Sequence, residues 1–257
     1  TYEINVMGTV NLLECVRRKE GVKSVLNVTT DKVYRNEEWE WGYRETDSLD
    51  GFDPYSNSKS CSELVTHCYA QSFLKEKGAA VSTARAGNVI GGGDFAPDRI
   101  IPDCVRGAAA GQVIEIRHPD SIRPYQHVLD PLFAYLTVAM GQYRDPALAG
   151  CYNIGPADAD CVTTGRLADI FCREWGEGAR WGQGEAQGPG ELHEANFLKL
   201  DSSKIRSALK WAPRWDIETA VRKTVEWSKR YYAGEDVTAV MDGQIAEYCR
   251  GVGLAMS

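Results

Sequence analysis

Two groups of side chains in this sequence have the types and the spacing that proton transfer requires. The first is the run YSNSK, in which Tyr55 and Lys59 stand four residues apart. On a helix this spacing places both side chains on one face. A free tyrosine ionises only near ~10, but an ammonium held beside it favours the phenolate. The pair can therefore move a hydroxyl proton during hydride transfer. Taken alone, the motif is better explained by an exposed Tyr and Lys on a helix surface.

The second group is TTDK, residues 29–32, which follows the apolar stretch SVLNV at 24–28. The hydroxyl of Thr30 can hydrogen-bond a sugar oxygen, Asp31 can protonate a leaving hydroxyl, and Lys32 can accept a carbon-bound proton. These roles need a neutral carboxyl and a neutral amine, which burial or a neighbouring charge provides. The plainer alternative is a strand end with a turn-forming Asp and a solvated Lys. Both groups together favour chemistry at this strand end.

A glycine-rich run and a group of arginines suggest phosphate binding. Residues 91–96 (GGGDFA) match the spacing of a dinucleotide-binding turn. We reject that interpretation because Asp94 and Asp98 would place negative charge where a pyrophosphate must lie. Pro97 and Pro102 also delay the helix that should begin within the glycines.

Arg123 is better suited to a diphosphate, because a guanidinium offers a fork of donors to phosphate oxygens. Arg99 and Arg117 are placed to reinforce it. Each of the three, taken singly, also fits an ordinary surface residue.

Composition excludes several classes of function. The chain has 257 residues, 43% of them apolar, and a net charge of −7 with scattered Lys and Arg, so we expect no nucleic-acid partner. No apolar run approaches the ~18 residues of a membrane span. Eight cysteines without a C-x-x-C pair indicate reduced thiols and a cytoplasmic protein. The four histidines form no i, i+4 pair, so we predict no metal site.

The elements that must position these groups follow from hydrophobic spacing and from Gly and Pro. We expect helices at 3–19, about 55–76, 99–110, 130–143, 163–175, 202–209, 216–231 and 240–255. We expect strands at 24–28, 80–90, 113–116 and 151–155, and loops at 35–54 and 176–190. This alternation predicts an α/β fold with a largely parallel sheet, whose ligands bind beyond the carboxyl ends of the strands.

The order of motifs along the chain resembles the extended short-chain dehydrogenase/reductase family and, within it, the nucleotide-sugar 4,6-dehydratases. The resemblance runs from Thr1 to about Trp227. The motifs, in order, are N-x-x-G-T (5–9), TTDKVY (29–34), DPYSNSK (53–59), RAGNVIGGGD (85–94), IRPYQHV (122–128), YNIG (152–155) and LKLDSSK (198–204).

This resemblance implies a doubly wound Rossmann-type domain for NAD, at 1–90 plus 124–155, and a smaller nucleotide-sugar domain, at 91–123 plus 156–257. The chain begins at Thr1, without Met and directly in a helical pattern. We therefore expect it to be part of a longer protein whose preceding segment carries the first strands and the glycine fingerprint, so that this chain alone binds NAD poorly. The resemblance also implies a homodimer and a role in deoxysugar biosynthesis, such as that of lipopolysaccharide O-antigen.

The resemblance further implies a role for each candidate residue. Tyr55 would take the proton of the sugar 4-hydroxyl, Lys59 would assist it and hold the nicotinamide ribose, and Thr30 would bond the 4-oxygen. Asp31 would protonate the departing 6-hydroxyl, and Lys32 would remove the C5 proton. The NAD contacts would be Thr29, Tyr55, Lys59 and Val89, and the substrate contacts Thr30, Asn88, Arg99, Ile100, Glu115, Arg117, Arg123, His193 and Glu194.

Lys32 bears on the nucleotide of the substrate. The dTDP-glucose type carries Glu at this position, whereas the branch acting on CDP-glucose carries Lys, so the resemblance favours CDP-glucose. A 4-epimerase or a decarboxylase of the same family remains an alternative, although an epimerase needs no elimination acid. A non-catalytic nucleotide-sugar binder, or an inactive truncated chain, is the second alternative.

Overall fold

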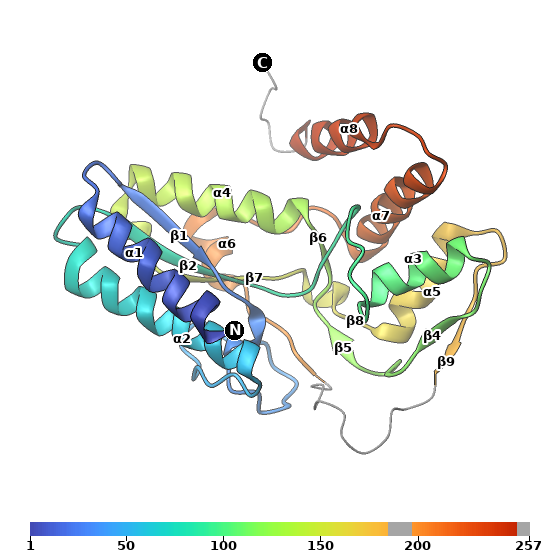
Figure 1. Ribbon diagram of the computed structural model, residues 1–257, viewed down its shortest axis with the longest axis horizontal. Helices are drawn as coiled ribbons and strands as arrows, with labels where there is room; N and C mark the ends of the chain where they lie inside the picture. The colour runs from blue at the N-terminus through green and yellow to red at the C-terminus, as the bar shows by residue number, and fades with distance from the viewer. Residues whose placement is uncertain (185–196, 251–257) are drawn as a thin grey trace. The chain divides into compact units, whose positions relative to one another are not determined.

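A computed structural model describes residues 1–184 and 197–250. The chain divides into two compact units (Figure 1). The first comprises Thr1–Gly87, Pro131–Gly155 and Phe197–Ala212, and the second Asn88–Asp130, Pro156–Asn196 and Pro213–Ser257.

The first unit is built on a parallel sheet in the order β1-β2-β7, formed by Ser24–Val28, Ala80–Ala86 and Cys151–Ile154. One face is covered by α1 (Gly8–Arg18), which continues the π-helical turn Glu3–Met7, and by α2 (Pro54–Tyr69), which continues into a second such turn, Ala70–Leu74. The other face is covered by α4 (Leu129–Arg144) and α6 (Ser203–Leu209). A parallel sheet covered on both faces is the arrangement that βα alternation predicts.

Alternate residues of the strands supply the two cores of this unit. Val25 and Val81 pack with Leu13 and Leu74 on the face of α1 and α2. On the face of α4 and α6 the core consists of Ala84, Ala86, Ala134, Val138, Tyr152, Ile154, Ile205 and Trp211. Side chains at the carboxyl ends of the strands are therefore held by packing on both sides.

In its described residues, the second unit packs helices around short strand pairs. These helices are α3 (Ile100–Ala109), α5 (Thr164–Trp175), α7 (Ile217–Tyr232) and α8 (Val237–Arg250). The pairs are β3 (Val89–Ile90) with β6 (Gln126–His127) and β4 (Ile114–Ile116) with β9 (Trp181–Gln183), both parallel, and β5 (Ile122–Arg123) with β8 (Val162–Thr163), which is antiparallel. Ile101, Ile114, Leu167, Phe171 and Val221 belong to its buried core.

The structure confirms the α/β class and most of the predicted elements, with several differences. The short strands β5, β6 and β8 were not expected. The strand expected at 80–90 is two strands, because the chain leaves the main sheet after Ala86 and the Asn88 carbonyl then accepts from the Gln126 N–H. The expected loop at 176–190 contains β9, whose Gly182 interrupts the apolar pattern that marks a strand. Of the helix expected at 240–255, residues 251–255 lie outside the described range.

The compact units also divide the chain at positions other than the expected domain boundaries. Residues 197–212 lie in the first unit, where Tyr43 exchanges backbone hydrogen bonds with Lys199 and Asp201. Residues 88–90 and 124–130 lie in the second. The assignment of one unit to NAD and the other to the nucleotide sugar remains a prediction.

Candidate active site at the carboxyl end of β1

The start of α2 fixes the backbone of Tyr55. Asp53 is the N-cap residue, and its Oδ1 accepts from the N–H groups of Tyr55 and Ser56 at 2.9 and 3.0 Å. Pro54 occupies the first helical position, where a missing N–H costs nothing. Tyr55 therefore lies in a well-defined first turn, and its side chain is 46% exposed.

Lys59 lies one helical turn further on and reaches the end of β1. Its Nζ is 3.4 Å from the carbonyl oxygen of Val28, the last residue of that strand. Burial lowers the pKa of Lys59, and the nearby Glu63 carboxylate acts in the opposite direction. The amine of the Tyr–Lys pair thus lies beside the segment that follows β1.

That segment, TTDK, forms a tight turn against α2. The Thr30 hydroxyl donates to Asp31 Oδ1 at 3.0 Å and accepts from the Lys32 N–H at 3.4 Å. Asp31 is only 3% exposed, whereas Lys32 is exposed. The Ser60 hydroxyl of α2 donates to the Val33 carbonyl at 2.7 Å. The turn Asp31–Val33 is therefore tied directly to the helix that carries Tyr55 and Lys59.

The ammonium of Lys32 also affects the pKa of Asp53, the N-cap residue of α2. Burial raises the pKa of Asp53, but hydrogen bonds from Ser56 and Tyr55 and the ammonium of Lys32 together bring it below its usual range. All five residues predicted to be catalytic therefore lie in the first unit, on α2 or on the turn packed against its start. Their roles remain predictions.

A buried polar network beneath this site was not predicted from the sequence. Glu63 and Arg85, each with 2% of its side chain exposed, form an ion pair of 2.8 Å between α2 and β2. Arg85 also donates to the Tyr34 hydroxyl at 2.8 Å, which donates to Asn153 Oδ1 at 2.6 Å. Burial raises the pKa of Tyr34. One signal was available, because an arginine inside the otherwise uncharged strand AVSTARA needs a buried partner.

The residues predicted to hold the nucleotide diphosphate lie in the second unit, in different environments. Arg99 and Arg117 form long ion pairs with Asp94 and Asp98, at 3.7 and 3.6 Å. The Arg99 side chain is exposed and that of Arg117 is half-buried. Arg123 is 6% exposed and donates to the Ile122 carbonyl at 2.9 Å. Arg123 is thus largely withdrawn from the surface, unlike Arg99.

The remaining predicted contacts are less distinctive. Asn88 and Val89 are half-buried. The Asn88 carbonyl accepts from the Gln126 N–H, and Val89 pairs with Gln126 between β3 and β6. Ile100 packs against the core of the second unit, and Glu115 is exposed in the middle of β4. His193 and Glu194, also predicted as substrate contacts, lie outside the described residues.

The glycine-rich turn after β3 has a packing role. A Cβ at Gly92 would lie 2.2 Å from the Trp227 ring, so only glycine allows this approach. The ring in turn stacks on Tyr231, with centroids 5.3 Å apart. Helix α3 begins only at Ile100, well beyond the glycines. These contacts support the rejection of a phosphate-binding turn here.

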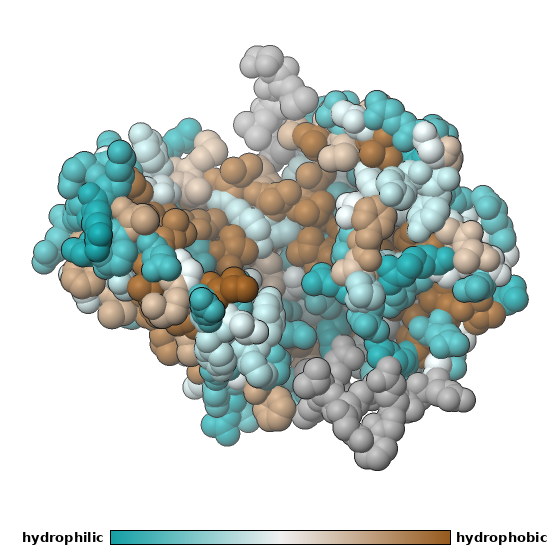
Figure 2. All heavy atoms as spheres, viewed as in Figure 1, coloured by the Kyte–Doolittle hydropathy of each residue, from teal (hydrophilic) through white to brown (hydrophobic). Residues whose placement is uncertain are grey.

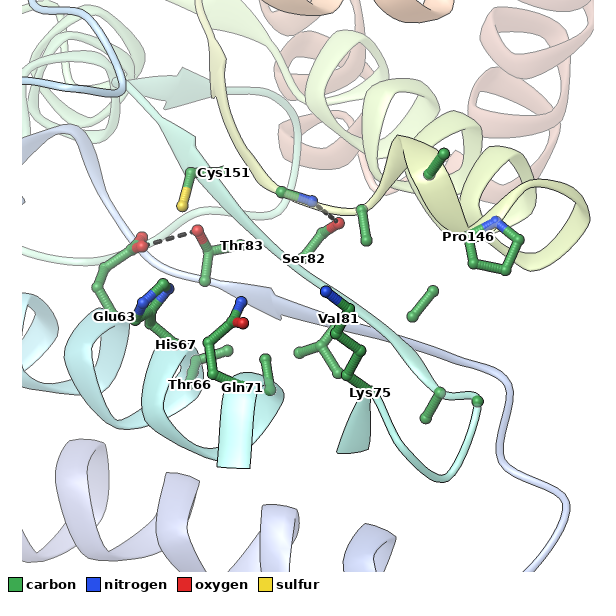
Figure 3. A pocket seen from close by; sticks show the side chains of 17 residues that line it. Glu63, Thr66, His67, Gln71, Lys75, Val81, Ser82, Thr83, Pro146 and Cys151 are labelled. Carbon is green, nitrogen blue, oxygen red and sulfur yellow. Dashed lines mark hydrogen bonds between the residues drawn. The ribbon is translucent and has the colours of Figure 1, made fainter. Parts of the chain in front are cut away.

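A cavity of about 470 Å³ lies beside the buried network of the first unit, with Glu63 and Thr83 in its lining (Figure 3). His67 and Gln71 line it from α2 and the turn that follows, Ser82 from β2, and Cys151 from the start of β7. Because it adjoins the amino-terminal ends of β2 and β7, it is distinct from the turn at the carboxyl end of β1.

Within the described ranges, no cluster of His, Cys, Asp and Glu is suited to a metal ion. None of the helices described there has the length and apolarity of a membrane span.

A parallel sheet with Tyr and Lys four residues apart on the helix at its carboxyl edge is the arrangement of an extended short-chain dehydrogenase/reductase. Solved structures show the same fold. The dTDP-glucose 4,6-dehydratase of Streptomyces venezuelae, with NAD and TYD bound, has a TM-score of 0.74 at 24% identity, over 91% of this chain and 68% of that one. The UDP-glucuronic acid 4-epimerase of Bacillus cereus, with UDP-glucuronic acid and NAD, has a TM-score of 0.75 at 18% identity, over 89% and 68%.

Sequence comparison is more specific. Residues 1–224 match the family described as GDP-mannose 4,6 dehydratase. The CDP-glucose 4,6-dehydratase of Salmonella typhimurium is 44% identical over 254 residues, covering 96% of this chain and 70% of the relative. The dTDP-glucose 4,6-dehydratase of Xanthomonas campestris is 27% identical, over 94% and 69%. The chain belongs to the GDP-mannose 4,6 dehydratase family, which confirms the resemblance to nucleotide-sugar 4,6-dehydratases.

Proposed function

We propose that this protein catalyses the NAD-dependent 4,6-dehydration of a nucleotide-activated hexose, converting CDP-D-glucose to CDP-4-keto-6-deoxy-D-glucose and water. The observation that carries the proposal is the docking of the turn Asp31–Val33 on α2 through Ser60. It joins residues suited to oxidation at C4 with residues suited to elimination across C5 and C6. The 44% identity to a CDP-glucose 4,6-dehydratase supports the choice of substrate.

The residues at the end of β1 fit a nicotinamide cofactor. Lys59 is half-buried and lies beside the Val28 carbonyl at the carboxyl edge of the sheet, where such folds bind dinucleotides. When bound, NAD accepts a hydride and later returns it, so it is regenerated in each turnover. Thr29, directly after β1, and Lys59 of α2 would line its site, and Val89 is a further proposed contact.

Each proton transfer is assigned to one side chain. Tyr55 takes the proton from the 4-hydroxyl, while the ammonium of Lys59 stabilises the phenolate and Thr30 bonds the 4-oxygen. The ketone so formed acidifies the C5–H, whose proton passes to the amine of Lys32 in its neutral form. The 6-hydroxyl leaves as water with a proton from the buried Asp31. When hydride returns to C6, Lys32 gives its proton back to C5, which completes the 4-keto-6-deoxy sugar.

The test combines the whole protein with NAD and CDP-glucose and measures the alkaline absorbance of a 4-keto sugar. Lys32→Ala should bind NAD as the parent does and yet lose at least about 100-fold in product formation, because general-base catalysis contributes roughly that much or more. Lys19→Ala, which changes an exposed lysine at the end of α1, is the matched control and should keep full activity.

The assay also separates the alternatives. Normal turnover by Lys32→Ala would remove that residue from the mechanism. An epimerised sugar without the alkaline absorbance would show a 4-epimerase, like the structural neighbour from B. cereus. Binding of CDP-glucose without any conversion would show a non-catalytic binder.

The protein is further proposed to be a cytoplasmic homodimer that serves deoxysugar biosynthesis, such as that of O-antigen. The eight cysteines are all free, which supports a reducing compartment. Exposed apolar side chains on α2, on α1 and on the turn before α1 support self-association, since Leu64 is 57%, Leu12 59% and Ile4 77% exposed. Figure 2 shows apolar residues among the polar ones on the face of the first unit turned toward the viewer.

A further inference from the structure

The residues 30–32, which carry the elimination chemistry proposed above, lie between two residues that are held in place. Before them, the Thr29 N–H donates to the Ala84 carbonyl at 2.8 Å, and its hydroxyl donates to Glu63 Oε1 at 2.5 Å. Thr29 is 8% exposed, so both contacts are shielded from water. The start of the segment is therefore tied to β2 and to α2 at once.

After them, Tyr34 is held in the same way. Its hydroxyl accepts from Arg85 Nη1 at 2.8 Å and donates to Asn153 Oδ1 at 2.6 Å. Its ring stacks on Tyr43 with centroids 5.2 Å apart. The end of the segment is thus tied to β2 and β7.

The two attachments belong to one network. Glu63 holds Thr29, Arg85 holds Tyr34, and the two charged groups pair with each other at 2.8 Å. Glu63 Oε2 also accepts from the Thr83 hydroxyl at 2.7 Å. Because burying two charges costs about as much as their attraction returns, such a pair adds little net stability. What this pair does contribute is geometry, since it fixes the two ends of the segment relative to one another.

We propose that Glu63, Arg85 and Tyr34 are positioning residues of the dehydration reaction: they hold residues 30–32 against α2 while Tyr55 and Lys59 act at C4 of the sugar. This inference rests on the proposed function. It implies that loosening the network slows elimination, which depends on the segment, more than it slows oxidation, which depends mainly on α2.

Tyr34→Phe is the least disruptive test because it keeps the stacked ring and removes only the hydroxyl. We expect kcat for 4-keto product to fall at least about 10-fold with KM changed less than about 2-fold, since one hydrogen bond to a charged group is lost. Oxidation should then outpace elimination, so that the absorbance of reduced nicotinamide builds up during turnover. The matched control is Tyr152→Phe, which removes the hydroxyl of a tyrosine residue that is equally buried; this hydroxyl bonds to the Leu148 carbonyl. It should leave kcat and the absorbance unchanged.

Glu63→Gln tests the charge at the centre of the network. The groups facing Lys59 are the Val28 carbonyl of β1 and the Glu63 carboxylate of its own helix. Loss of that carboxylate should therefore lower the pKa of Lys59 and shift the alkaline limb of kcat/KM to lower pH. Glu63→Asp, which keeps the charge, should return the alkaline limb of kcat/KM to the pH of the parent. Gln142→Leu, on the opposite face of the sheet, removes partly buried hydrogen bonds to Ser24 and Val25 and should not move this limb.

The outcomes are distinguishable. If the parent protein makes no 4-keto sugar, the proposed function fails and the roles of these residues in it fail too. If the parent is active and Tyr34→Phe matches Tyr152→Phe in kcat and in nicotinamide absorbance, the positioning role is overturned while the proposed function stands. Should Glu63→Gln fail to fold, the Tyr34→Phe result decides.

Discussion

Single residues of the same type take very different roles here, depending on burial. Sequence reasoning grouped Arg99, Arg117 and Arg123 as diphosphate ligands, yet Arg123 is 6% exposed, whereas the Arg99 side chain is 66% exposed. It missed Arg85, whose partner Glu63 lies 22 residues away in sequence and on another element. Residue type and local spacing predict possible chemistry. The depth of a side chain and its partner depend on packing between distant segments, which a single sequence does not display.

We predict that His127 makes the free energy of unfolding depend on pH. Burial, with a contribution from Lys223, lowers the pKa of His127 to about 4. The unfolded chain takes up this proton near pH 6.5 and the folded chain only near 4, so the free energy of unfolding should fall as the pH drops between these values, by about 3 kcal/mol. His127→Asn keeps an acceptor for the Leu129 N–H but cannot titrate.

The measurement is denaturant unfolding of parent and variant at several pH values. The parent should lose more stability than His127→Asn between pH 6.5 and 4. His67→Asn, which changes an exposed histidine of α2, should retain the parent slope. Parallel curves for parent and His127→Asn would contradict the assignment.

At the scale of elements, α2 is held by small polar side chains. Ser58 accepts from Asn5, Ser62 bonds Thr9 at 2.8 Å, and Ser60 bonds the Val33 carbonyl. Asn5 and Thr9 of the N-x-x-G-T motif thus hydrogen-bond to serines of α2, one within YSNSK and one just after it. Sequence reasoning found both motifs but not their contact, because helix spacing identifies a face without identifying what packs on it.

The cap of α2 should affect both stability and activity. Asp53→Ala removes the acceptor of the Tyr55 and Ser56 N–H groups and should cost about 1 kcal/mol of unfolding free energy. Because the first turn also orients Tyr55, kcat should fall as well. Asp216 is the N-cap residue of α7, and its Oδ1 accepts from the Thr219 N–H. Asp216→Ala should cost a similar unfolding free energy and leave kcat unchanged.

Chemical denaturation and turnover of the same two preparations make the comparison. Equal loss of kcat in both variants would mean that Asp53 acts through global stability alone.

For the whole molecule, the α/β class and the main helices could be predicted because their hydrophobic periods are long and regular. Among the short strands of the second unit, β4 was expected, but β5, β6, β8 and β9 were not, since two or three residues carry no period. The extent of each compact unit was also beyond reach, because residues 197–212 join the first unit through contacts with Tyr43 and with Ile154 of β7. When a segment distant in sequence joins an earlier unit, it does so through tertiary contacts that no local pattern specifies.

Association of two copies is the prediction at this scale. Leu64 of α2 is 57% exposed, and Ile4 and Leu12 on the neighbouring helical segment are exposed as well. Burying such side chains in a symmetric interface would contribute about 1.5–3 kcal/mol each. Leu64→Glu should therefore shift the mass measured by light scattering from dimer toward monomer. Leu132→Glu, which adds the same charge at an exposed leucine of α4, is the control and should leave the mass unchanged. A parent protein that is monomeric at micromolar concentration, or a Leu64→Glu variant that stays dimeric, would rule out this interface.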